Sequence, residues 1–213
     1  AASDVYKRQV GLFIQSPAGN VLHTGDFKLD QTPIDGITTD FGAIAEDSRI
    51  GVDLLMSDST NANIPTFTPS EAEVGKVLNR IIAQATGRVV IASFASHIHR
   101  MQQICDAAIA NGRKVVVTGR SMVQNTDIAR RLGYLHISDD NLLDAYYMKD
   151  MPPEQVVVMC TGSQGEPLSA LARIASGNHK TISIEKGDTV IISASPVPGN
   201  EKAVTNIMNL LSK

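Results

Sequence analysis

Apolar, β-branched runs alternate with amphipathic segments along most of this chain, and this alternation constrains the fold more than any other feature. The runs that precede segments with apolar residues at helical spacing are RVVIASF, KVVVTG, QVVVMCTG and DTVIISASPVPG. Strands that alternate with helices build a parallel sheet, because each helix returns the chain to the edge where the previous strand began. The sequence therefore predicts an α/β domain with a mainly parallel sheet and helices on both faces.

Two further segments have helical character. An amphipathic helix is predicted over TFTPSEAEVGKVLNRIIAQATG, where Ser70 and Glu73 resemble a capping box and Thr68 is an alternative cap. The segment DDNLLDAYYMKDMPPEQ predicts a helix that ends at the Pro-Pro break.

The N-terminal part has a different pattern. Apolar runs at 10–14 and 21–24 flank the turn-forming SPAGN, so a hairpin is predicted. The continuous apolar run at 52–56 predicts a strand buried on both faces. The segment QTPIDGITTDFGAIAED between them predicts a loop with one helical turn. Residues 1–9 have no initiator Met, signal core or periodicity, so we interpret them as a non-native tract.

Composition narrows the function classes. The net charge of −3 over 213 residues excludes a broadly basic nucleic-acid clamp, but leaves room for a local site of a few arginines and backbone amides. The two cysteines, Cys105 and Cys160, have no metal-spaced neighbours and predict reduced core thiols. No apolar run approaches the roughly 18 residues of a membrane helix. We expect a cytoplasmic protein with no membrane partner.

Four strand-to-helix loops carry unusual chemistry: SFASHIHR, TGRSM, CTGSQGEP and SPVPGNE. Ligands of parallel α/β sheets bind beyond the carboxyl ends of the strands, so these loops together suggest a phosphate or nucleic-acid surface. The plainer interpretation is that their Gly and Pro residues only form turns and caps, and that His97 and His99 are structural. Neither the dinucleotide nor the P-loop glycine fingerprint occurs.

Asp26 and Asp58 each end an apolar strand of the N-terminal part. An aspartate at this position commonly closes a turn or caps a helix. With His23 nearby, the two carboxylates also fit ligands or supporting groups of a hydrolytic metal centre, because oxygen and imidazole ligands suit zinc and manganese. The residues alone leave both interpretations open.

The segments VLHTGDFKLDQTP, LLMSDSTNA, IASFASHIHRMQQI, GRSMVQN, CTGSQGEPLSAL and ISASPVPGNE, in this order, resemble ribonuclease J. This family comprises nucleases with a metallo-β-lactamase fold and an inserted β-CASP domain. The resemblance implies that residues 10–62 are the C-terminal part of the first metallo-β-lactamase segment, of αββα type. It implies that residues 63–213 are an incomplete β-CASP domain with a Rossmann-like sheet.

The resemblance also implies a function. The parent protein would be a hydrolase that cleaves RNA as a 5′–3′ exonuclease and an endonuclease in RNA processing and decay, with a water activated by two Zn²⁺ ions; Mn²⁺ or Mg²⁺ are alternatives. Asp26 matches the aspartate that bridges the metals, and Asp58 matches the acidic residue that supports their site. RNA or phosphate contacts are expected from Ser96, His97, Arg100, Ser163, Gln164 and Gly165.

The departures from the family pattern are as informative. The histidine cluster HxHxDH and the other motif histidines have no counterpart in this sequence. We therefore expect an internal fragment with an incomplete catalytic site and no activity of its own, in which His23 is structural. RNA, further copies of the protein and an RNA-decay complex are the expected partners. The alternatives are a non-hydrolytic nucleotide- or RNA-binding α/β module and a structural assembly module.

Overall fold

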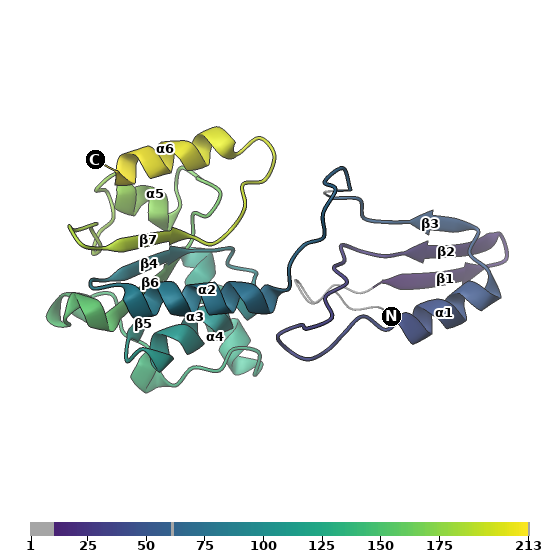
Figure 1. The fold of residues 1–213 in the computed structure, drawn as a ribbon, viewed down its shortest axis with the longest axis horizontal. Coiled ribbons are helices and arrows are strands. Elements are labelled where there is room, and N and C mark those ends of the chain that lie inside the picture. Colours follow the sequence, from purple (N-terminus) through teal and green to yellow (C-terminus); the bar gives the residue numbers. More distant parts are fainter. Residues whose placement is uncertain (1–10, 61, 213) are drawn as a thin grey trace. The chain divides into compact units, whose positions relative to one another are not determined.

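The chain forms two compact units, one up to Val74 and one from Gly75, in the computed structural model (Figure 1). The structure describes residues 11–60 and 62–212, so the tract at 1–9 lies outside the described residues. The division between the units falls within helix α2 (Glu71–Gln84). The domain boundary that the sequence analysis places between residues 62 and 63 stays a prediction.

The first unit contains a three-stranded sheet in the order β1-β2-β3. Strands β1 (Leu12–Ser16) and β2 (Gly19–His23) are antiparallel, with Phe13 opposite Leu22. This confirms the predicted hairpin. Strand β3 (Leu54–Met56) pairs with β2 in parallel, so the carboxyl ends of β2 and β3 meet at one edge of the sheet.

Two expectations for this unit are wrong. The run that contains β3 was expected to be buried on both faces, yet Leu54 and Leu55 are 53% and 57% exposed. The reason is that β3 is an edge strand and no described segment of this unit covers its faces. The expected loop with one helical turn contains a ten-residue helix instead, α1 (Phe41–Ile50). Asp40 caps α1 by accepting a hydrogen bond from the amide of Ala43, and no residue of α1 is buried.

The second unit is built on a four-stranded, all-parallel sheet in the order β5-β6-β4-β7. The strands are β4 (Val89–Ala92), β5 (Lys114–Thr118), β6 (Val156–Cys160) and β7 (Thr189–Ile192). Each corresponds to one of the apolar runs of the sequence, so the predicted α/β class and parallel sheet are confirmed. Burial raises the pKa of the Cys160 thiol to about 12, and Cys105 is also buried and free, as expected of inert core thiols.

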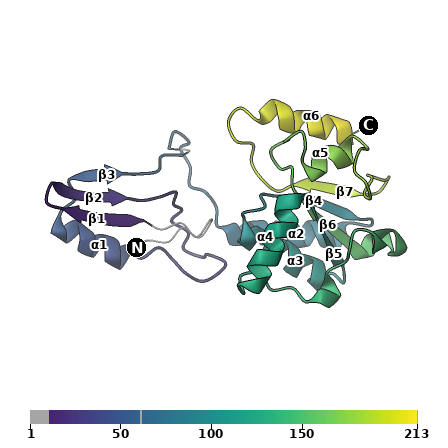
Figure 2. The same cartoon turned by 180° about the vertical axis from the view of Figure 1, so that it is seen from behind.

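Helices cover this sheet on both sides. The helices that follow α2 are α3 (Ile98–Ala110), α4 (Arg120–Arg131), α5 (Ala170–Ala175) and α6 (Glu201–Leu211). Leu171 of α5 and Ile207 of α6 pack in one core cluster with Val90 and Val158 of the sheet. Figure 2 shows α2, α3 and α4 on the other side of the strands. No helix in the described parts of the chain is both long and apolar enough to cross a membrane.

The prediction of a helix before the Pro-Pro break is wrong. That region holds three short 3-10 turns instead, at Asp139–Asn141, Tyr147–Asp150 and Pro153–Gln155. The amide of Leu143 donates a 2.9 Å hydrogen bond to the carbonyl of Val115 in edge strand β5. This pairing with the sheet uses a backbone group that an α-helix would need, so tertiary contact overrides the local helical pattern.

Candidate functional site

The carboxyl ends of β2 and β3 form the first candidate site, a corner joined by hydrogen bonds from both strands. The amide of Thr24 donates to the carbonyl of Met56 at 3.0 Å. The amide of Asp58 donates to the Thr24 hydroxyl at 3.0 Å. The two aspartates of the sequence analysis, Asp26 and Asp58, therefore follow strand ends that the structure holds together.

The carboxylate of Asp58 is held by backbone and hydroxyl donors. It accepts hydrogen bonds from the amide and the hydroxyl of Thr60, at 3.0 and 2.8 Å. These two bonds, and weaker contributions from the amides of Phe27 and Ser59, lower the pKa of Asp58 against the opposing effect of burial. The amide of Phe27, the residue after Asp26, thus contributes to the electrostatic environment of the Asp58 carboxylate.

Asp26 is exposed at the end of the turn that leaves β2. Within that turn, Nδ1 of His23 accepts a 3.0 Å hydrogen bond from the amide of Gly25, whose φ of 64° favours glycine. His23 thus shapes the turn that presents Asp26, in agreement with a structural role.

A metal at Asp26 would need more ligands than this corner offers. In the described residues, no three His, Cys, Asp or Glu side chains gather closely enough to hold an ion. A zinc site takes about four ligands, and one carboxylate supplies at most two oxygens. The described residues alone therefore do not fit a complete metal centre, and the ligand role of Asp26 stays a prediction.

Asp30 is a further acidic residue of this unit, and the sequence analysis did not single it out. Its side chain is buried, at 5% exposure, and its carboxylate accepts hydrogen bonds from Thr32, Ser70 and Glu71. The available signal was an acid between apolar and turn residues in the segment FKLDQTP, only four positions after Asp26.

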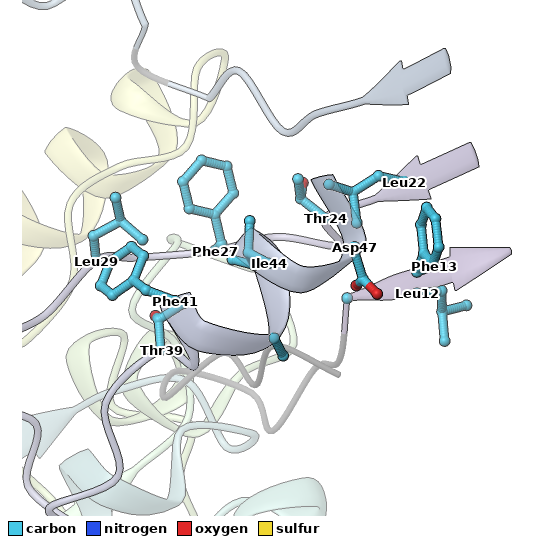
Figure 3. Close-up of a pocket in the computed structure, with 12 residues that line it drawn as sticks. Leu12, Phe13, Leu22, Thr24, Phe27, Leu29, Thr39, Phe41, Ile44 and Asp47 are labelled. Carbon is cyan, nitrogen blue, oxygen red and sulfur yellow. The ribbon is translucent and has the colours of Figure 1, made fainter. Parts of the chain in front are cut away.

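A pocket of about 500 Å³ lies between the hairpin and α1 in the same unit (Figure 3). Its lining is mainly apolar, with Phe27, Leu29 and Phe41 among the side chains that Figure 3 labels. Asp47 contributes the one carboxylate of the described lining. An apolar pocket whose charged group is an acid does not suit a phosphodiester, so this pocket does not fit the RNA contacts expected from the sequence.

The second candidate site is the carboxyl edge of the parallel sheet, where the four chemically unusual loops lie. Here Nη1 of Arg100 donates a 2.8 Å hydrogen bond to the carbonyl of Ser193 and a second bond to its hydroxyl. Arg100 is only 5% exposed. Its guanidinium therefore ties α3 to the loop after β7.

Gln164 and Gly165 form a second tie at this edge. The Gln164 side chain donates to the carbonyl of Ser195 at 3.0 Å and accepts from the amide of Val197 at 2.7 Å. Gly165 has a φ of 73°, and a Cβ there would lie 2.5 Å from the backbone carbon of Ala203 in α6. Both residues bring the loop after β6 against the start of α6.

The remaining expected contacts divide by exposure. Ser96 is exposed, whereas Nδ1 of the buried His97 caps α3 by accepting from the amide of Arg100 at 3.3 Å. Ser93 and Ser163 are each 1% exposed, and their hydroxyls have no hydrogen-bond partner among the described residues. These two hydroxyls are therefore buried polar groups of the loops that make no hydrogen bond within the described residues.

This edge is thus a tightly bonded set of loops rather than an open row of side chains. Of the six residues expected to contact RNA, Ser96 alone is exposed, and the other five are buried. A polyanion would meet Ser96 and loop backbone first. The six contacts themselves stay predictions.

Comparisons with known proteins identify the family to which the α/β unit is similar. A family model described as the β-CASP domain of ribonuclease J matches residues 86–211. Proteins named Ribonuclease J from Mycolicibacterium smegmatis and Thermus thermophilus are 51% and 49% identical over 200 and 201 residues. Each comparison covers 94% of this chain but only 36% and 35% of those relatives. The chain therefore spans about a third of the length of the relatives it matches.

A solved structure also shares the fold. It is the crystal structure of a protein of unknown function from Enterococcus faecalis V583, with a TM-score of 0.54 at 14% identity. The similarity covers 99% of this chain and 55% of that one, and at this identity it concerns the fold alone. With the family model matched over most of the second unit and the parallel sheet in place, this chain belongs to the ribonuclease J family through its β-CASP domain.

Proposed function

We propose that this chain is part of a longer, metal-dependent ribonuclease, called the parent protein below. The parent protein hydrolyses RNA from 5′ ends and internally, in RNA processing and decay. The observation that carries this proposal is the similarity to proteins named Ribonuclease J across 94–96% of the chain. RNA is the proposed substrate, and self-association and an RNA-decay complex are the proposed further interactions.

Asp26 is the residue of this chain that we propose takes part in the metal chemistry. Its carboxylate would provide an oxygen ligand for Zn²⁺, with Mn²⁺ or Mg²⁺ as alternatives. Bound metals would supply an activated water and stabilise the charge that develops during phosphodiester hydrolysis. The proposed part of Asp58 is to support the corner at Asp26, where its amide bonds to the Thr24 hydroxyl and so joins the ends of β2 and β3. The remaining ligands have no counterpart among the described residues.

The parallel sheet supports the proposed RNA contacts. Its four loops gather at one edge, where Ser96 is exposed and the turn at Ser163 and Gln164 is held in place by internal hydrogen bonds. Contacts to phosphate at such an edge do not depend on base sequence. Arg100 and Gln164 hold these loops together through hydrogen bonds to the loop after β7, and Gly165 allows a close approach to α6.

The first test is Asp26→Ala in the parent protein. We expect RNA cleavage to fall at least about a thousandfold, as for loss of a group that acts on the reacting atoms, while the dissociation constant for RNA changes less than twofold. Asp35→Ala is the control, because Asp35 lies in the same segment and accepts a hydrogen bond within its own turn from Ile37. Wild-type turnover by Asp26→Ala would refute the assignment.

The isolated 213-residue chain separates this proposal from its alternatives. We expect it to bind RNA without cleaving it in the presence of Zn²⁺ or Mn²⁺. Metal-dependent cleavage by the purified chain contradicts the incomplete site. Saturable binding of a mononucleotide without metal, measured by calorimetry, supports a nucleotide-binding module instead. Self-association without any RNA affinity supports an assembly module.

A further inference from the structure

We propose that Asp30 is a positioning residue for Asp26, because its carboxylate fastens the segment that carries Asp26 to the start of helix α2. The proposal rests on the proposed function of Asp26. We call this set of contacts the Asp30 clasp and define it as residues 28–32 together with residues 69–71.

The clasp joins segments far apart in the sequence through both oxygens of one carboxylate. Oδ1 of Asp30 accepts a 2.9 Å hydrogen bond from the amide of Thr32, which closes a local turn. Oδ2 accepts from the Ser70 hydroxyl at 3.0 Å and from the amide of Glu71 at 3.1 Å. These two partners lie 40 and 41 positions away in the chain.

Neighbouring groups reinforce the same junction. The Lys28 ammonium donates to the carbonyl of Pro69 at 2.7 Å and lies 3.8 Å from Oδ2 of Asp30. The Ser70 hydroxyl also lies 2.9 Å from the carbonyl of Thr32. Residues 28, 30 and 32 thus each contact the short stretch 69–71, so the junction is a built structure and not a single bond.

The charge of Asp30 suits this position. Burial by itself raises the pKa of Asp30, but hydrogen bonds from Thr32, Glu71 and Ser70, together with the charge of Lys28, hold it below its usual value. The carboxylate also lies at the N-terminus of α2, where the helix dipole stabilises a negative charge. The clasp is therefore formed with an ionised Asp30 near neutral pH.

Capping alone does not account for these contacts. Ser70 already caps α2, because its hydroxyl accepts a 3.2 Å hydrogen bond from the amide of Ala72. Glu71 and Glu73 place further acids in the first turn. The effect that Asp30 adds is to fix the distant segment 28–32.

Asp26 lies two residues before Lys28, where this fixed segment begins. On the N-terminal side of Asp26 the amide of Gly25 donates a hydrogen bond to Nδ1 of His23, and on the C-terminal side the Lys28 ammonium donates one to the carbonyl of Pro69. A metal-binding carboxylate has to be held within about 0.5 Å of its working position by the structure behind it. The turn closed by His23 and the segment fastened by Asp30 together provide this support for the exposed Asp26.

Asp30→Asn tests the clasp with minimal change of shape. The asparagine keeps an oxygen for the Thr32 amide but places an NH₂ group where Oδ2 accepts from Glu71. The control is Asp35→Asn, an exposed aspartate of the same segment whose Oδ1 accepts from Ile37. Hydrogen exchange of the 213-residue chain is measured by mass spectrometry on peptides that cover residues 24–32.

We expect these peptides to exchange at least tenfold faster in Asp30→Asn and at an unchanged rate in Asp35→Asn. Peptides from β1 and β2 serve as the internal reference and should not change. Ser70→Ala removes one clasp partner and should give a smaller change in the same direction, which keeps the test informative if Asp30→Asn does not fold. Unchanged exchange of residues 24–32 in a folded Asp30→Asn or in Ser70→Ala overturns the proposal.

Kinetics of the parent protein form the second arm. Asp30→Asn should lower kcat for RNA cleavage at least tenfold with KM within twofold of the wild-type value, because the loop loses its position and not its affinity for RNA. If Asp26→Ala is inactive while Asp30→Asn keeps the wild-type kcat, the clasp does not position Asp26 and this inference fails. If Asp26→Ala keeps wild-type activity, the proposed function fails, whatever the exchange data show.

Discussion

The side-chain oxygen of Gln164 accepts a 2.7 Å hydrogen bond from the backbone amide of Val197, which joins the loops that follow β6 and β7. These two strands are not neighbours, because β4 lies between them in the sheet. The bond therefore passes across the end of β4, close to the loop that leads into α3. Gln164 itself is 5% exposed, whereas its partner Val197 is 49% exposed.

Gln164→Ala should destabilise the chain by about 1 kcal/mol, because it removes the hydrogen bonds to the amide of Val197 and the carbonyl of Ser195, two exposed residues whose freed groups water can reach. Thermal unfolding followed by circular dichroism should show a melting temperature lower by roughly 3 °C. Gln84→Ala, at the exposed end of α2, is the matched control and should change the melting temperature by less than about 1 °C. Equal shifts for both variants would show that the link does not stabilise the fold.

Gly165→Ala should be more damaging than Gly177→Ala. Both glycines have nearly the same backbone angle, with φ of 73° and 71°. A Cβ at Gly165 meets the backbone of Ala203 at 2.5 Å, whereas a Cβ at Gly177 meets nothing within 4 Å. The free energy lost in Gly177→Ala therefore measures only the cost of a left-handed backbone at a non-glycine residue, about 1 kcal/mol. Gly165→Ala has this cost and also that of displacing α6. Urea denaturation should show at least about twice the loss for Gly165→Ala, and equal losses would contradict the close approach.

The parallel sheet was predictable because its strands carry their own signal. Val89–Ala92 and Val156–Cys160 are fully buried runs of apolar residues, and such runs alternating with helices are typical of α/β folds. Helix α1 carries a weaker signal, because Asp40 marks its cap but none of its residues belongs to a buried apolar face. The 3-10 turns at 139–155 depend on a pairing with β5 that local pattern does not encode.

The candidate sites were predictable only in part. Strand-end position pointed to Asp26 and Asp58, and the parallel pairing of β2 with β3 brings their strand ends together. The chemistry of the loop residues did not reveal which would turn inward, because the burial of Arg100 and Gln164 depends on partners after β7. Asp30 escaped notice for the same reason, since its partners at 70 and 71 become visible only when the chain is folded.

Substitution of Arg100 should affect the stability of the chain, whereas substitution of Ser96 should affect its RNA binding. Arg100→Met removes the bonds to Ser193 from a buried position and should lower the stability of the chain by about 2 kcal/mol or more. Ser96→Ala changes an exposed hydroxyl and should leave the melting temperature unaltered while weakening RNA binding about threefold, as for one lost hydrogen bond. Thermal unfolding and fluorescence anisotropy with a labelled single-stranded RNA measure both effects. If Ser96→Ala binds RNA as the wild type does, that contact is excluded.

Protonation of His179 should destabilise the second unit at mildly acidic pH. Nδ1 of His179 accepts hydrogen bonds from the amides of Thr181 and Ile182 at 3.4 and 3.2 Å, so the proton of the neutral ring lies on Nε2, 3.1 Å from the Thr118 hydroxyl. Burial, and then the charge of Arg173, lower the pKa of His179 in the folded chain. The folded state therefore favours the neutral ring.

The direction of the pH effect follows from this pKa shift. Above the unfolded pKa of about 6.5 both states hold a neutral ring, and the contribution of His179 to stability is complete. As the pH falls below that value the unfolded chain takes up the proton first, so stability decreases until the pH reaches the lower pKa of the folded state. Melting temperatures at pH 7.5 and 5.0 should differ more for the wild type than for His179→Asn, whose side-chain oxygen can replace Nδ1 as an acceptor but does not titrate. An identical pH dependence in the two proteins would show that another group causes the acid sensitivity.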